Sequence, residues 1–222
     1  MNVLAIDTAG KRFSATVDTG SERFTLTVDS QRQHAERLLS SIDSLLVLAG
    51  IGPKDVALVT CPEGPGSFTG LRLAYATAKA FQLATSCRFL PVPTLECYAL
   101  PFSACAGAVV CAVDAKKNRY YAQVFRRGIA VTESLDVSSG EITGLLDAEE
   151  RVLVVGPDAE RLAEELSALM PASRVDYVTP GGSEISETLA KIAKTRHLQY
   201  TDGVSDYAGP AYVRKSDAET GT

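Results

Sequence analysis

The sequence predicts an α/β protein built from two lobes, and three observations lead to this class. Short apolar runs of strand length alternate with longer segments whose apolar residues recur at helical spacing. A hairpin pattern near the N-terminus recurs about half-way along the chain. The 222 residues are enough for two small lobes, each with its own core.

Composition excludes several classes of protein. Hydrophobic residues make up 45% of the chain and charged residues 22%, as in an ordinary soluble globular protein. A net charge of −5 argues against strong direct binding of nucleic acid. The five cysteines form no C-x-x-C pair, which indicates reduced, buried thiols and a cytoplasmic protein. Asp7 interrupts the first apolar run, and no segment approaches membrane-spanning length, so we expect neither signal peptide nor membrane contact.

The first elements are three strands and a helix. Strands are predicted over Val3–Ile6, Phe13–Val17 and Arg23–Val28. A helix follows over about Arg32–Ala49, with Asp29 or Ser30 as its cap. Its wide apolar stripe consists of Ala35, Leu38, Leu39, Ile42, Leu45, Leu46 and Ala49.

A glycine-rich loop then joins a buried strand over Val56–Thr60 to a helix over Leu71–Ala84. Its spacing, G-x-G-x-x-x-G, matches neither the dinucleotide fingerprint nor a Walker A loop. Two interpretations remain: a rigid strand-to-helix turn, or an anion site formed by free N–H groups at the helix N-terminus. The residues of this loop that carry either interpretation are Gly64, Gly66, Ser67, Thr69 and Gly70, with Ser67 or Thr69 as the helix cap.

The helix over Leu71–Ala84 has small or apolar side chains on nearly all of its sides, which is unusual for a helix with one solvent-exposed face. Either it is enclosed within its lobe, or one face meets another protein. A short strand over Phe89–Val92 and a helical segment over Thr94–Leu100 follow.

The chain then repeats its opening hairpin. Ala5–Val17 aligns without a gap on Ala112–Val124, and five of the thirteen positions are identical, including Asp7 and Asp114. The two carboxylates have two interpretations: a paired site across a cleft, or residues that cap and shape the two hairpins. We favour the second interpretation. The two hairpins are also no longer equivalent, because the second has Ala115-Lys-Lys117 where the first has Thr8-Ala-Gly10.

The second half is less regular. Strands are predicted over Ile129–Val137 and Arg151–Val155, and a helix over Ala159–Leu169 with Asp158 as its cap. A last helix runs from Ser183 or Ser186 to about His197, and Ser216–Thr222 is predicted to be disordered. The expected lobes are 1–103, with residues from about 184 to 222 packing back on it, and a smaller lobe over 104–183.

A duplicated hairpin whose first strand ends in Asp7-Thr8 resembles the actin-like ATPase superfamily (ASKHA, ribonuclease H-like), built from a duplicated βββαβα unit. In that fold the hairpins hold phosphates, so Asp7, Thr8 and Asp114 would be vestigial phosphate-hairpin residues. Further motifs resemble the bacterial TsaB (YeaZ) family nearly along the whole chain. They are Ala5-Ile-Asp-Thr8, His34-Ala-Glu-Arg-Leu-Leu39, Gly64-Pro-Gly-Ser-Phe-Thr-Gly-Leu-Arg72, Thr94-Leu-Glu96 and Pro210-Ala-Tyr-Val-Arg214.

The resemblance implies a relative of TsaD, the catalytic subunit that makes N6-threonylcarbamoyladenosine in tRNA. Where TsaD carries two metal-binding histidines, this chain has Thr94 and Tyr98, which are poor replacements for imidazole ligands. We therefore expect no metal site, no catalytic residue and no required cofactor. A nucleotide, ATP or ADP, at the interface of the complex is compatible with this view.

The expected function is that of a non-catalytic scaffold or activator subunit that binds TsaD, and with it the ATPase TsaE and tRNA. The alternative is a small actin-like-fold ATPase or kinase acting alone. Without TsaD, the same apolar surface is expected to form homodimers. The predicted interface residues lie on the first two helices and are Leu38, Leu39, Ile42, Leu71, Ala74, Ala76, Ala78 and Phe81.

Overall fold

The computed structural model describes residues 1–10, 12–29, 34–171, 174–179, 184–198, 209–211 and 213. Contacts divide the chain into two compact units, one drawn from residues 1–97 and 181–210 and the other from 98–180 and 211–222. Among the described residues, no helix is both long enough and apolar enough to cross a membrane.

The first unit is built on a five-stranded mixed sheet in the order β3-β2-β1-β4-β6. Strands β1 (Val3–Asp7), β2 (Phe13–Asp18) and β3 (Arg23–Val28) form an antiparallel meander, as the sequence predicts. Strands β4 (Leu58–Thr60) and β6 (Arg88–Phe89) extend the sheet in parallel with β1.

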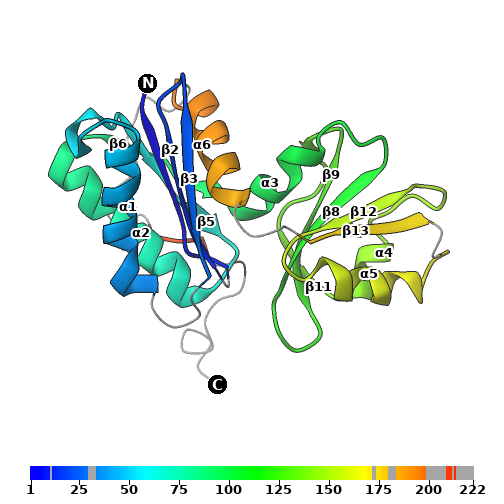
Figure 1. The fold of residues 1–222 in the computed structure, drawn as a ribbon. Coiled ribbons are helices and arrows are strands. Elements are labelled where there is room, and N and C mark those ends of the chain that lie inside the picture. The colour runs from blue at the N-terminus through cyan, green and yellow to red at the C-terminus, as the bar shows by residue number, and fades with distance from the viewer. Residues whose placement is uncertain are drawn as a thin grey trace. The chain divides into compact units, whose positions relative to one another are not determined.

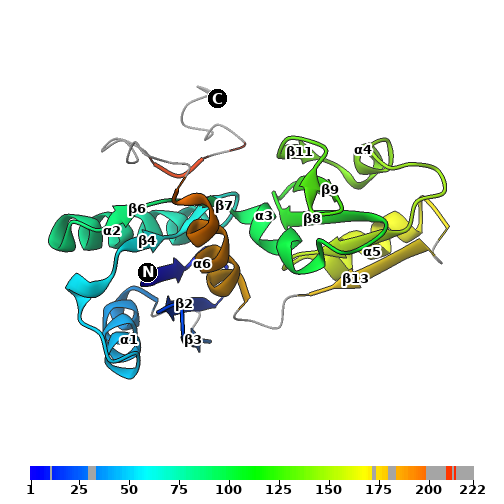
Figure 2. The ribbon, with the colours of Figure 1, turned by 90° about the horizontal axis from the view of Figure 1, so that it is seen from above.

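Helices cover both faces of this sheet (Figures 1 and 2). Helices α1 (His34–Leu48) and α2 (Phe68–Thr85) pack on one face, and α6 (Glu184–Arg196) on the other. The predicted start of α1 at Arg32 and its cap Ser30 lie outside the described residues, and Asp29 forms an ion pair with Arg12 at 3.1 Å. The core under α1 and α2 includes Leu4, Ile6, Phe13, Ala15, Val17, Leu38, Ile42, Leu45, Ala74, Tyr75 and Ala78.

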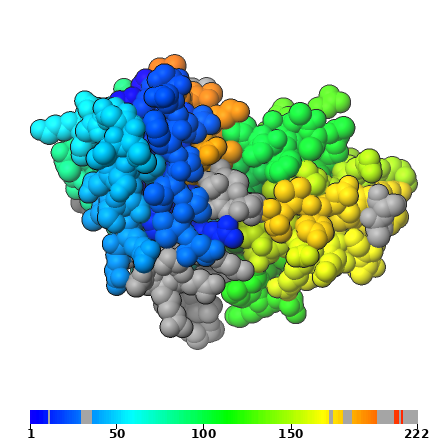
Figure 3. Space-filling view, in the orientation of Figure 1, coloured from blue at the N-terminus to red at the C-terminus, as the bar shows by residue number. Residues whose placement is uncertain are grey.

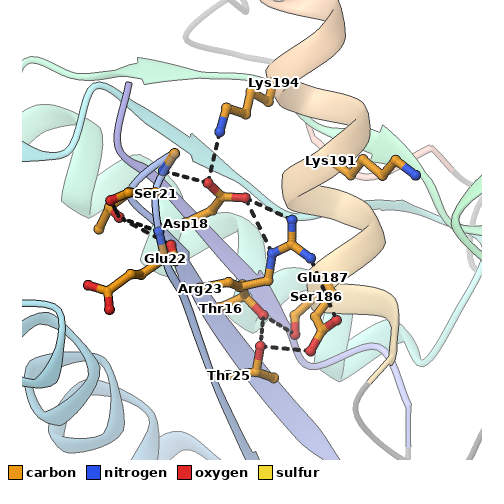
Figure 4. Close-up of polar contacts among 12 residues, drawn as sticks. Thr16, Asp18, Ser21, Glu22, Arg23, Thr25, Ser186, Glu187, Lys191 and Lys194 are labelled. Carbon is orange, nitrogen blue, oxygen red and sulfur yellow. Dashed lines mark hydrogen bonds and ion pairs between the residues drawn. The ribbon is translucent and has the colours of Figure 1, made fainter.

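A polar cluster fastens α6 to the sheet (Figure 4). Asp18, at the end of β2, accepts hydrogen bonds from Lys194 Nζ at 2.8 Å and Arg23 at 3.0 Å. Thr16 bonds to Ser186 at 2.8 Å, and both are completely buried. Burial alone would raise the pKa of Asp18, but the bonds from Lys194, Arg23 and the Gly20 N–H hold that pKa below its ordinary value. The carboxylate is therefore charged at neutral pH and anchors α6.

The second unit repeats the plan with a six-stranded sheet. Its main order is β10 (Ile129–Ala130), β9 (Tyr120–Arg126), β8 (Ala108–Asp114), β12 (Val152–Val155) and β13 (Val175–Val178). The predicted strand over Ile129–Val137 is wrong as one element, because β10 and β11 (Leu135–Val137) pair with different parts of β9. Helices α4 (Ser139–Thr143) and α5 (Ala159–Ser167) enclose its core through Ile142, Ala159, Leu162, Ala163 and Leu166.

The two hairpins differ by one residue in register, which corrects the gapless alignment. Asp7 pairs with Ser14, leaving six residues between them, whereas Asp114 pairs with Tyr120, leaving five. On the second strands the alignment preserves the core face, since Phe13 and Tyr120 are both fully buried in their cores. On the first strands it does not, because Ile6 occupies the core position that Ala112 occupies in the second unit. In the sheet, Asp114 therefore corresponds to Thr8 rather than to Asp7.

Other predictions need smaller corrections. The predicted strand over Phe89–Val92 is two pieces, since Arg88–Phe89 joins the main sheet while β7 (Val92–Pro93) pairs with β5 (Pro62–Gly64), a strand inside the predicted glycine loop. Short helices lie at Pro53–Asp55, Thr94–Ala99 (α3) and Leu100–Phe102. Asp158 is the N-cap of α5, but its side chain makes no capping bond. The predicted tail over 216–222 and the predicted helix start at Ser183 lie outside the described residues.

Candidate functional site

The glycine loop of the first unit is a shaped turn between β5 and α2. Gly64 has a φ of 123°, a backbone conformation that favours glycine, and a cis peptide bond joins it to Pro65. Ser67 is the N-cap of α2, with its Oγ accepting from the Gly70 N–H at 3.3 Å. Of the two candidate caps, Ser67 is therefore the residue used.

This loop is tied to the turn that follows β1. Thr8 Oγ1 donates to the Gly70 carbonyl at 2.6 Å, and the Ser67 N–H donates to the Ala9 carbonyl at 3.0 Å. A Cβ on Gly70 would lie 1.9 Å from the Thr8 oxygen, and one on Gly66 would lie 2.9 Å from Ala9 Cβ. Close backbone approach, rather than positive φ, therefore requires glycine at 66 and 70. These contacts explain the glycine spacing by packing within the chain, which favours the rigid-turn interpretation over the anion site.

Asp7 shapes the turn to which the loop is tied. It is 4% exposed, and its Oδ1 accepts from the Ala9 N–H at 2.9 Å. The neighbouring thiol of Cys61 is fully buried, and its pKa is raised by burial first and by Asp7 and Glu63 second. This cysteine therefore stays protonated and is no nucleophile at neutral pH.

Asp114 shapes the hairpin of the second unit in the same way. Its Oδ1 accepts from the Lys116 N–H at 2.9 Å and its Oδ2 from Lys116 Nζ at 2.7 Å. Burial would raise the pKa of Asp114, but these bonds to Lys116 and the charge of Arg161 lower it. Its own N–H donates to Asp158 Oδ2 at 2.9 Å, which explains why Asp158 does not cap α5 with its side chain. Asp7 and Asp114 thus each stabilise the turn that follows their own strand.

Thr94 and Tyr98, predicted to stand where TsaD carries its metal-binding histidines, lie at the start and near the end of α3. Thr94 is 1% exposed, and its Oγ1 has no hydrogen-bond partner among the described residues. Tyr98 is half-buried. Within the described ranges, no three His, Cys, Asp or Glu side chains gather in a group that would hold a metal ion.

The structure corrects the predicted interface residues of α1 and α2. Five of them face the core of their own unit and are at most 2% exposed, so they are not available to a partner: Leu38, Ile42, Leu71, Ala74 and Ala78. Phe81 is partly buried against the same core. Only Leu39, 64% exposed, and Ala76 lie at the surface. The apolar stripe predicted for α1 therefore includes both buried residues, such as Leu38 and Ile42, and the exposed residue Leu39.

Sequence reasoning missed most of the apolar residues that are exposed on these helices. Val47 is 78% exposed, Leu48 65%, Phe68 48% and Leu83 82%. Figure 3 shows α1, in light blue, lying at the surface of the first unit. A signal exists in the sequence for Val47 and Leu83, because they lie on the helix sides opposite to the core residues Leu45 and Ala78. Leu48 and Phe68 are the last residue of α1 and the first residue of α2, where the helical period gives no such signal. We call Leu39, Val47, Phe68, Ala76 and Leu83 the exposed apolar face.

A family model described as "TsaD: tRNA N6-adenosine threonylcarbamoyltransferase" matches residues 28–193 of the chain. The chain is similar to the "tRNA threonylcarbamoyladenosine biosynthesis protein TsaB" of Haemophilus influenzae, with 30% identity over 132 residues. That match covers 58% of this chain and 56% of the relative, so it spans little more than half of the relative's length. The protein of the same name from Bacillus subtilis is 22% identical over 99% of this chain and 96% of its own.

A Mycobacterium tuberculosis protein of uncharacterized function is 31% identical over 67% of this chain and 72% of its own. Among solved structures, one titled "YeaZ from Pseudomonas aeruginosa" superposes with a TM-score of 0.77 at 24% identity, covering 95% of this chain and 99% of that one. A second Pseudomonas aeruginosa structure, of a protein with similarity to the peptidase YEAZ, gives 0.79 at 24% identity over 96% and 99%. The predicted fold class, an α/β fold of the actin-like ATPase type, is confirmed.

Proposed function

The chain belongs to the TsaB (YeaZ) family, which is involved in the biosynthesis of tRNA threonylcarbamoyladenosine, and from this premise we propose that it is a non-catalytic subunit that binds TsaD. TsaE and tRNA join the complex through TsaD, and ATP or ADP at the interface is part of the same proposal. The protein works in the cytoplasm.

One observation carries the proposal, namely the exposed apolar face on α1 and α2. Four large apolar side chains of this face are 48–82% exposed, and they lie on two helices that share one face of the sheet: Leu39, Val47, Phe68 and Leu83. Scattered single apolar residues need no explanation, but a group on adjoining helices marks an interaction site. TsaD, a relative within the same family model, would supply a comparable helical face.

The residues that could act as catalytic acids, metal ligands or nucleophiles support a non-catalytic role. Asp7 accepts a hydrogen bond within its own turn, and so does Asp114. Thr94 and Tyr98 stand where TsaD would bind its metal. The buried cysteines Cys61 and Cys111 have a pKa raised by burial.

Ala76→Arg tests the proposal. Ala76 is exposed near the middle of α2, so arginine costs the helix little but places a long charged side chain where a partner helix would approach. We expect binding to TsaD to weaken at least a hundredfold, about 2.7 kcal/mol, with an almost unchanged melting temperature. The amount of threonylcarbamoyladenosine should fall in tRNA from cells whose only copy carries the variant.

The matched control is Ala168→Arg, at an exposed alanine that ends α5 in the second unit. It should bind TsaD like the wild type. If Ala76→Arg also binds like the wild type, the partner surface lies elsewhere. Substantial ATP hydrolysis by the purified chain alone would instead support the alternative of an independent ATPase.

A further inference from the structure

One edge of the six-stranded sheet in the second unit is formed by β10, whose residues are exposed and uncharged. Ile129 is 70% exposed and Val131 45%, and Ala130 between them is exposed as well. Edge strands of natural proteins usually carry a lysine, a proline or another feature that prevents pairing with a second strand. Residues 128–132, which read Gly-Ile-Ala-Val-Thr, contain no charge and no proline. This edge is therefore suited to accept a further strand.

The hydrogen bonds of the ladder show which backbone groups face outward at this edge. The Val131 N–H donates to the Val124 carbonyl at 2.9 Å, and Ile129 lies opposite Arg126. Successive residues of an antiparallel strand direct their backbone groups to opposite edges. The N–H and the carbonyl of Ala130 therefore point away from β9. They offer one donor and one acceptor to a second strand.

The charges at the two ends of this segment are complementary to each other. Arg127 lies in the turn before β10 and Glu133 follows it; both are exposed, and neither forms an ion pair within the described part of the chain. Each is three residues from Ala130, so an antiparallel copy centred on Ala130 brings Arg127 of one chain opposite Glu133 of the other, twice. It also brings Ile129 opposite Val131, twice. The segment is thus complementary to itself in charge, in apolar contact and in backbone hydrogen bonding.

We propose that β10 pairs with β10 of a second copy as an antiparallel strand centred on Ala130, which gives the second unit a self-association surface of its own. The two Ala130 residues exchange both backbone hydrogen bonds, and Ile129 packs against Val131 on one face. The contact is short and weak, because the Thr132 hydroxyl accepts from the Val124 N–H at 3.0 Å and ends the ladder. It shares no residue with the exposed apolar face and does not depend on TsaD.

Disulfide cross-linking of the full chain tests this register. One chain carries Ile129→Cys, and a second, tagged chain carries Val131→Cys. In the proposed contact these positions form a non-hydrogen-bonded pair with Cα atoms about 4.5 Å apart, which a disulfide can span. Two copies of the same variant meet only across a diagonal of about 7–8 Å, which is too far. The mixture should therefore give at least about fivefold more cross-linked dimer than either variant alone.

The wild type under the same oxidant measures linking through native thiols such as the partly exposed Cys105. Both replaced side chains are exposed, so the variants should melt like the wild type. A mixture that links no more than the single variants overturns the inference. That outcome includes the case in which the edge binds a strand of a different protein.

Arg127→Glu tests the end pairs, with the rate of the mixed cross-link at low salt as the readout. It places Glu opposite Glu133 at both ends, and linking should slow about tenfold. Adding Glu133→Arg makes the charges opposite again and should restore the rate. Arg151→Glu is the matched control, since Arg151 is exposed in the same unit and lies outside the β10 segment, and it should leave the rate unchanged. If Arg127→Glu slows linking no more than this control, or if the double reversal does not restore the rate, the inference is overturned.

Discussion

Gly70→Ala tests whether the glycine loop is a packed turn. Gly70 lies in the first turn of α2, against the backbone of Thr8. A Cβ there would lie 1.9 Å from the Thr8 oxygen, whereas ordinary contacts begin near 3.4 Å, so the two segments must separate by about 1.5 Å. Such a shift also breaks the bond from Thr8 Oγ1 to the Gly70 carbonyl.

The expected cost follows from these terms. Overpacking in a close-packed region costs about 1–3 kcal/mol, and the lost buried hydrogen bond adds about 1 kcal/mol. Replacing glycine by alanine inside a helix returns roughly 0.5–1 kcal/mol. The net destabilisation is about 1–3.5 kcal/mol, which lowers the melting temperature of a chain of this length by roughly 2–14 °C.

Thermal unfolding of the variant beside Gly140→Ala measures the effect. Gly140 lies in α4, and an added Cβ there meets nothing within 4 Å, so this control should be neutral or slightly stabilised. Equal melting temperatures for the two variants would refute the claim that the loop packs against the Thr8 turn. Hydrogen exchange should also show faster opening around Thr8 and Gly70 in the Gly70→Ala variant alone.

Three further predictions concern other features. Asp18→Asn should lower the free energy of unfolding by about 2 kcal/mol at neutral pH. Because the folded-state pKa of Asp18 is lowered, this contribution is present above its ordinary value of 3.8 and is lost as pH falls through the folded pKa. The urea midpoints of variant and wild type should therefore converge in acid. Gly64→Val should cost about 1–3 kcal/mol through strain at a φ of 123°, seen as a lower urea midpoint. Elemental analysis should find far less than one iron or zinc ion per chain. One tightly held metal ion per chain would contradict the prediction that Thr94 and Tyr98 leave the chain without a metal site.

The strands and helices of the first unit were predictable because each has a clear period or boundary signal. The meander from Val3 to Val28 has strand-length apolar runs broken by turns, and α2 begins at a serine cap. Short strands were not predictable in the same way. Pro62–Gly64 contains proline and glycine, which usually exclude a strand, and only its pairing with Val92–Pro93 makes it one.

The register of the second hairpin was hidden for a related reason. Similar residues follow Asp7 and Asp114, but alternation is strict only within a strand, so one residue fewer in the turn reverses the faces without altering the apparent match. The predicted interface set mixes buried with exposed side chains, because apolar content does not say which side of a helix is covered. Leu38 and Leu39 are neighbours in sequence, yet one is 1% exposed and the other 64%.

The position of α6 in the chain has a consequence for synthesis on the ribosome. The first unit takes its strands from residues 3–93 but one of its covering helices from Glu184–Arg196, so this helix cannot cover its face of the sheet until the ribosome has made residues 184–196. At bacterial speeds of roughly 5–20 residues per second, residues 90–183 take about 5–19 s. The strands and helices of the second unit, at residues 108–178, are contiguous and complete within this interval. The unit whose strands are made first is therefore completed only after the second unit.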